Sequence, residues 1–113
     1  MRPTKATIRL DDIASNYQVA SRLAPSSRSI AVIKANAYGH GMVEVAKELQ
    51  DLVPVFAVAL MEEALQLRNA GISKPILVLQ GSSGAAEIRK ALDNEFWLLL
   101  HQQQQIDRLV SAN

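Results

Sequence analysis

The stretch Ala31-Val-Ile-Lys-Ala-Asn-Ala-Tyr-Gly-His-Gly41 tells most about the fold and the chemistry of this chain. Its apolar start, within residues 29–33, is typical of a buried strand, and the two glycines at its end bracket a turn. Lys34 stands where the strand ends. A partly desolvated lysine amine is available as a nucleophile or base, and such lysines form Schiff bases with carbonyl compounds. The plain alternative is a lysine that buries its stem and keeps its ammonium in water.

From residue 29 onward, the pattern predicts strands and helices in alternation. We expect strands at 29–33, 55–59, 76–79 and 96–100, and helices at 42–52, 62–70, 85–92 and 104–110. Because the strand runs are apolar throughout, we expect both of their faces to be buried, as in parallel strands covered by helices. The pattern fits the first units of a (β/α)₈ barrel or half of an open doubly wound sheet, and it leaves this choice open.

The segment before this alternation predicts a short strand and a helix. Residues 6–10 alternate weakly, which favours a strand, and Asp11 or Asp12 can cap a helix that runs to about residue 23. The apolar face that we expect on this helix consists of Ile13, Tyr17, Ala20 and Ala24.

Composition excludes several classes of protein. The 113 residues suffice for one domain, and a hydrophobic fraction of 49% can supply its core. A net charge of +1 with scattered Lys and Arg predicts no nucleic-acid partner, and no apolar run approaches the length of a membrane span. The start lacks the apolar core of a signal peptide, so we expect a cytoplasmic protein. Without cysteine there is no disulfide framework and no thiolate metal site, and we expect no metal.

Four blocks of the sequence together resemble one known family. The block Lys34-Ala-Asn-Ala-Tyr-Gly-His-Gly41 is similar to the cofactor-attachment motif of bacterial alanine racemases, without a departure in eight positions. Ile8-Arg-Leu-Asp-Asp-Ile-Ala-Ser-Asn16 resembles the family's opening, and residues 62–72 and 75–79 resemble its next block. The resemblance covers nearly the whole chain and implies the barrel rather than the open sheet. It also implies pyridoxal 5'-phosphate as cofactor and alanine as substrate.

The resemblance implies roles for three residues. Lys34 would hold the cofactor as a Schiff base and act as one of two acid/base groups, on the face where D-alanine loses its proton. The Tyr38 hydroxyl would point at the cofactor phosphate, and Leu79 would pack beside the cofactor. From the residues alone, Tyr38 could equally be a tyrosine packed at the rim, and Leu79 a core residue. The second base, a tyrosine of the other subunit, and an arginine for the pyridine nitrogen belong to family regions beyond this chain, so we expect a homodimer in the full-length protein.

Other polar positions favour structural roles. Gly39 and Gly41 allow positive φ, so we expect a turn there rather than a phosphate cradle. His40 has no partner at metal-ligand spacing, and we expect it to be structural. Residues 81–84, Gly-Ser-Ser-Gly, lack the lysine of a P-loop and favour a plain turn.

The length conflicts with a complete barrel, which takes about 250 residues. We therefore expect residues 1–113 to be the N-terminal part of a barrel domain, without the remaining strands and the family's C-terminal β domain. The functional hypothesis is an alanine racemase that supplies D-alanine for peptidoglycan. The alternatives are a non-catalytic barrel that binds pyridoxal phosphate, and a truncated fragment that is inactive on its own.

Overall fold

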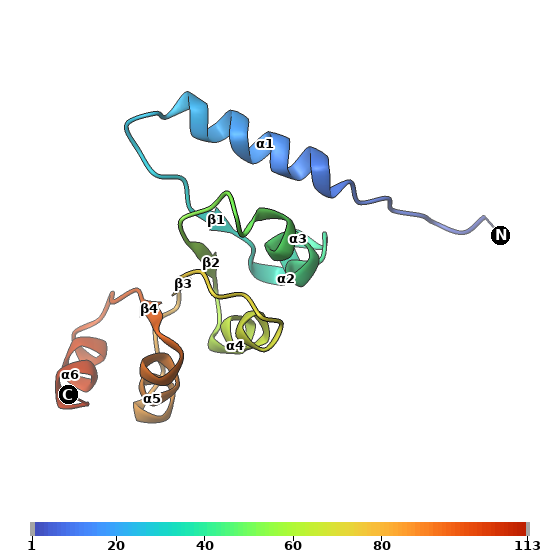
Figure 1. Cartoon of the computed structure of the whole chain (residues 1–113). Helices are drawn as coiled ribbons and strands as arrows, with labels where there is room; N and C mark the ends of the chain where they lie inside the picture. The colour runs from blue at the N-terminus through green and yellow to red at the C-terminus, as the bar shows by residue number, and fades with distance from the viewer. Residues whose placement is uncertain (1, 113) are drawn as a thin grey trace.

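Figure 1 shows a computed structural model of the chain, which describes residues 2–112. From residue 31 onward, strands and helices alternate as the sequence predicted, except that a short additional helix at residues 34–38 follows the first strand. The strands are β1 (Ala31–Val32), β2 (Phe56–Val58), β3 (Ile76–Val78) and β4 (Phe96–Leu98), and the helices are α1 (Leu10–Leu23), α2 (Lys34–Tyr38), α3 (Met42–Leu49), α4 (Met61–Asn69), α5 (Ala85–Asn94) and α6 (Gln103–Ser111). The hydrogen-bonded strands are shorter than the apolar runs that predicted them, but each lies inside its expected range.

The four strands form one parallel sheet in the order of the sequence, β1-β2-β3-β4. Phe56 pairs with Ile76, and Ile76 pairs with Phe96, so equivalent positions of the strands stand in one row across the sheet. Parallel neighbours need a crossover, and a helix supplies each one. All four strands therefore end at the same edge of the sheet.

The hydrophobic core lies between the sheet and the helices of one face. Figure 1 shows α3, α4 and α5 on the same side of the strands. The buried row that includes Phe56 and Ile76 packs with Leu49 of α3 and Leu67 of α4 in a single cluster. These side chains are at most 3% exposed, so this face is sealed from water.

The opposite face of the sheet corrects the expectation that both strand faces are buried. In its row, Ala57 is buried and Leu77 is half-buried, but Val32 of β1 is 40% exposed and Trp97 of β4 is 51% exposed. At the outer strands this face is therefore largely open to water. The apolar runs predicted two-sided burial because a barrel strand packs on both sides, but its inner side needs the rest of the barrel.

Helix α1 confirms the expected helix, with two corrections at its start. Residues 6–9 form no strand, because no strand of the described part of the chain lies beside them to share hydrogen bonds. The N-cap is Arg9, and Asp11 and Asp12 lie in the first turn, where negative charge suits the helix dipole. Arg9 Nε lies 2.9 Å from Asp12 Oδ2.

The expected apolar face of α1 packs against the core only in the first half of the helix. Ile13 and Tyr17 pack against the core, while Ala20 and Ala24 are exposed. The Tyr17 hydroxyl donates a 2.7 Å hydrogen bond to the Ser29 carbonyl, so it fastens the helix to the segment that leads into β1. Figure 1 shows α1 above β1, with its C-terminal end joined to β1 by a loop.

Candidate functional site

Lys34 lies at the carboxyl end of β1, where the chain leaves the sheet. It follows Ile33, whose amide still bonds to the Ala57 carbonyl of the neighbouring strand at 2.9 Å. Lys34 is half-buried, and it opens α2. In parallel α/β folds the carboxyl edge of the strands carries the chemistry. The structure thus places the lysine where the sequence expected it, at a strand end and partly out of water.

The turn after Lys34 is left-handed, which the sequence pattern did not predict. Ala35, Asn36, Ala37 and Tyr38 all have φ between 51° and 56°. Each such residue costs about 1–2 kcal/mol relative to the right-handed form. The expected positive φ at Gly39 and Gly41 is confirmed, at 89° and 96°, but the glycines only close a turn that four other residues begin. Backbone strain of this kind persists only where the surroundings hold it, and it gathers at functional sites.

Hydrogen bonds to polar groups of the turn hold this conformation. The Asn36 carbonyl accepts from the Gly41 amide at 2.9 Å, and its Oδ1 accepts from the Met42 amide at 2.9 Å. His40 Nδ1 lies 2.9 Å from the Ala37 carbonyl, which gives the histidine the structural contact that was expected of it. Asparagine is one of the few residues other than glycine that tolerates the left-handed region, so Asn36 suits its place.

A fourth contact, from Glu63 of α4, reaches the turn from outside. Glu63 Oε2 accepts from the Ala35 amide at 2.8 Å, and Oε1 accepts from the Ala59 and Leu60 amides at 2.9 Å each. No sequence pattern predicted this role for Glu63. The bonds to Ala59 and Leu60 could have been predicted from the sequence, because a glutamate at the third helical position commonly caps a helix start. The bond to Ala35, 28 residues away, has no such local sequence signal.

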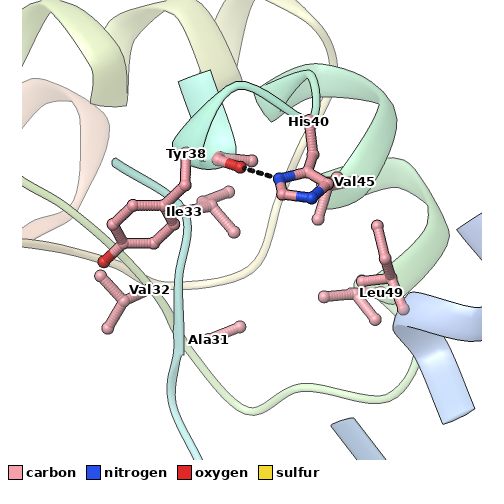
Figure 2. A pocket seen from close by; sticks show the side chains of 9 residues that line it. Ala31, Val32, Ile33, Tyr38, His40, Val45 and Leu49 are labelled. Carbon is pink, nitrogen blue, oxygen red and sulfur yellow. Dashed lines mark hydrogen bonds between the residues drawn. The ribbon is translucent and has the colours of Figure 1, made fainter. Parts of the chain in front are cut away.

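Tyr38 is 60% exposed and borders an apolar hollow of about 220 Å³. Figure 2 shows Tyr38 and His40 leaving the turn in opposite directions, with the tyrosine ring beside Val32 and Ile33. Ile13 of α1 lines the same hollow, but Lys34 is not among its lining residues. The hollow therefore lies behind the turn, between β1, α1 and α3, and the lysine amine is not part of it.

Leu79 follows the last residue of β3 at the same edge of the sheet. Its amide donates to the Val58 carbonyl at 2.8 Å, and its side chain is half-buried. The structure thus brings Lys34, Tyr38 and Leu79 to one edge, on the segments that follow β1 and β3. It does not gather them around a common hollow.

The Gly81–Ser82–Ser83–Gly84 segment forms a bend that already holds a carboxylate. The Ser83 amide donates to Glu87 Oε1 at 2.9 Å, and the Ser83 hydroxyl donates to the same oxygen. These bonds, the hydroxyl's first, lower the pKa of Glu87 below its usual value of 4.5. An anion from outside would meet this negative charge at the start of α5, so the arrangement agrees with the structural role expected from the sequence.

The sequence profile of the N-terminal domain of alanine racemases matches residues 8–113. The chain belongs to the alanine racemase family. An alanine racemase from Chromohalobacter salexigens is 50% identical over 97% of this chain, which spans 30% of that relative. A catabolic alanine racemase from Pseudomonas aeruginosa is 43% identical over the whole chain, which spans 31% of it.

The crystal structure of the biosynthetic alanine racemase from Pseudomonas aeruginosa superposes on this chain with a TM-score of 0.92 at 41% identity. The superposition covers 100% of this chain and 32% of that structure. The chain therefore has the fold of the N-terminal part of an alanine racemase barrel, and the barrel is incomplete within it. The same part is shared by catabolic and biosynthetic members.

The described helices do not include one with both the length and the apolar character that crossing a bilayer requires.

Proposed function

We propose that the chain is the N-terminal part of an enzyme that interconverts L-alanine and D-alanine, and that Lys34 carries its chemistry. Membership of the family supports this proposal. The observation that carries it is the position of Lys34. It is half-buried at the carboxyl end of the first strand and begins a strained turn whose eight residues match the family's attachment motif.

The donor set at this edge fits one end of pyridoxal 5'-phosphate. A primary amine is the group that binds an aldehyde covalently, and Lys34 provides one in a partly desolvated place. Lys34 would hold the cofactor, with the Tyr38 hydroxyl as a hydrogen-bond donor to its phosphate and Leu79 as an apolar contact. When bound, the cofactor withdraws electrons from the substrate and so eases the loss of its α-proton.

The chain's own residues would then bind, orient and move a proton. In one direction of the reaction the free amine of Lys34 would accept a proton at Nζ from one face of the substrate carbon, and in the other direction its ammonium would donate a proton to that same face. The left-handed turn keeps the lysine backbone in one orientation, so the amine approaches from one side. Racemisation also requires a base on the other face, which we propose comes from the remainder of the protein across a homodimer interface. We place the enzyme in the cytoplasm and assign D-alanine to peptidoglycan supply.

The test is a graft in which residues 1–113 replace the matching segment of the biosynthetic Pseudomonas aeruginosa enzyme. With pyridoxal phosphate and borohydride, peptide mass analysis should place the reduced adduct on Lys34. Lys34→Ala should abolish the adduct and the interconversion of alanine enantiomers, while Lys47→Ala, on the exposed side of α3, should change neither. An adduct that persists on Lys47 or Lys74 in the Lys34→Ala graft contradicts the assignment.

A further inference from the structure

The carboxylate of Glu63 joins the two strand-to-helix connections that flank the lysine. One oxygen accepts from the Ala59 and Leu60 amides, where β2 leads into α4. The other accepts from the amide of Ala35, the residue directly after Lys34. Because all three partners are donors, the side chain must be an acceptor at both oxygens, which only a carboxylate provides.

Helix α6 offers a comparison, because its third residue has a remote partner that accepts a hydrogen bond instead of donating one. Gln105 occupies the third helical position, and its Oε1 accepts from the His101 and Gln102 amides at 2.8 Å and 3.2 Å. Its Nε2 donates to the Gln80 carbonyl, in the connection after β3, at 3.3 Å. There the remote partner is an acceptor, so an amide side chain suits both ends. At Glu63 the remote partner is a donor, and helix capping alone does not explain the second oxygen.

We propose that Glu63 is a positioning residue for Lys34. The Ala35 amide shares its rigid peptide plane with the Lys34 carbonyl carbon and Cα. A carboxylate that fixes the direction of this N–H therefore fixes the plane, and with it the direction in which the Lys34 side chain leaves the end of β1. The contact also opposes the relaxation of a turn that is strained from Ala35 onward. The proposal rests on the proposed function only for the chemistry that the amine performs.

Glu63→Gln tests this role in the grafted enzyme, because the amide group cannot accept at both ends. Labelling of Lys34 by pyridoxal phosphate and borohydride should slow about five-fold, the factor for about 1 kcal/mol lost from a hydrogen bond that water can replace. Labelling of Lys47 and Lys74 should keep its rate. Glu62→Gln is the matched control: Glu62 is exposed on the same helical turn, and its variant should label as the unmodified chain does. An unchanged Lys34 rate in Glu63→Gln, together with a lower unfolding midpoint, would reduce Glu63 to a helix cap and overturn the proposal.

A second measurement needs no variant. In the grafted enzyme, hydrogen exchange of the Ala35, Ala59 and Leu60 amides should be slowed together, because each of them donates to Glu63. An Ala35 amide that exchanges without this protection overturns the proposal even if the variant does not fold.

Reductive methylation with formaldehyde separates this proposal from the proposed function. A Lys34 that methylates more slowly in Glu63→Gln, but takes no pyridoxal phosphate in either chain, supports positioning and removes the cofactor role. Equal labelling of Lys34 by both reagents in both chains supports an imine-forming lysine and overturns the positioning.

Discussion

At the scale of single residues, the unusual feature is a left-handed turn built from residues that disfavour it. Ala35 and Ala37 have no side-chain group that could compensate for φ near 50°, and Ala37 is buried in the core. The sequence pattern showed the strand, the lysine and the glycines, because these follow local rules. It could not show the handedness of the turn, because bonds from Asn36, His40 and Glu63 impose it.

Ala35→Gly should raise the free energy of unfolding. Glycine removes a left-handed penalty of about 1–2 kcal/mol, and it adds only about 0.5–1 kcal/mol of backbone entropy cost. Ala35 is exposed, so little packing is lost. Urea unfolding of the grafted enzyme measures the change, with Ala86→Gly, exposed in the right-handed helix α5, as the control that should lose stability. A loss of equal size at both positions would contradict the left-handed turn.

Tyr38→Phe should weaken the binding of pyridoxal phosphate by about 0.5–3 kcal/mol, the range for one hydroxyl hydrogen bond. Because Tyr38 is 60% exposed, the free energy of unfolding should change by no more than about 0.5 kcal/mol. Fluorescence titration of the grafted enzyme with the cofactor gives the affinity. If turnover falls while affinity stays the same, Tyr38 does not bind the phosphate.

At the scale of elements, the side chain of the third residue of three helices accepts hydrogen bonds from backbone amides of the connection that precedes the helix. Glu63 does this in α4, Glu87 in α5 and Gln105 in α6. The sequence predicted the alternation of these elements and most of their boundaries, since apolar runs and helical stripes are local signals. It wrongly predicted a strand at residues 6–10, because a weak alternation says nothing about whether a partner strand is present. It missed Glu63 because that side chain acts 28 positions away.

The start of α5 should contribute a small pH dependence to stability. Glu87 has its pKa lowered in the folded chain, so its contribution is present above its usual value of 4.5 and is lost as the pH falls through the folded pKa. The contribution is small because water screens the group. Glu87→Gln should therefore narrow the difference in unfolding free energy between about pH 7 and about pH 3. Chemical denaturation of the grafted enzyme at both pH values checks this, and a variant that keeps the full difference seen without the substitution would contradict it.

At the scale of the whole molecule, the four-stranded sheet formed within residues 2–112 has unpaired outer edges at β1 and β4 and one partly exposed face. The radius of gyration is 16.0 Å, against about 13 Å for a compact domain of this length. The shortest extent is 24 Å, so the chain is a flat slab rather than a globule. Composition could not reveal this shape, because the apolar content of a barrel part equals that of a closed domain.

Residues 1–113 alone should therefore associate or unfold without a sharp transition, and should not racemise alanine. Unpaired strand edges and the exposed Trp97 favour self-association. Trp97→Lys should increase the monomeric fraction in sedimentation, whereas Val19→Lys, on exposed α1, should not. A monomer that unfolds sharply and racemises alanine faster than free pyridoxal phosphate would contradict this prediction.

The even spacing of the last three strands has a consequence for biosynthesis. Phe56 and Ile76 pair across 20 positions, and so do Ile76 and Phe96. Each strand thus meets a neighbour that left the ribosome shortly before it, and short separations between contacting segments favour fast pairing. We expect the nascent chain to add one strand and helix at a time, in the order of translation. The hydrogen bond from the Ala35 amide to Glu63 would then form once α4 has emerged.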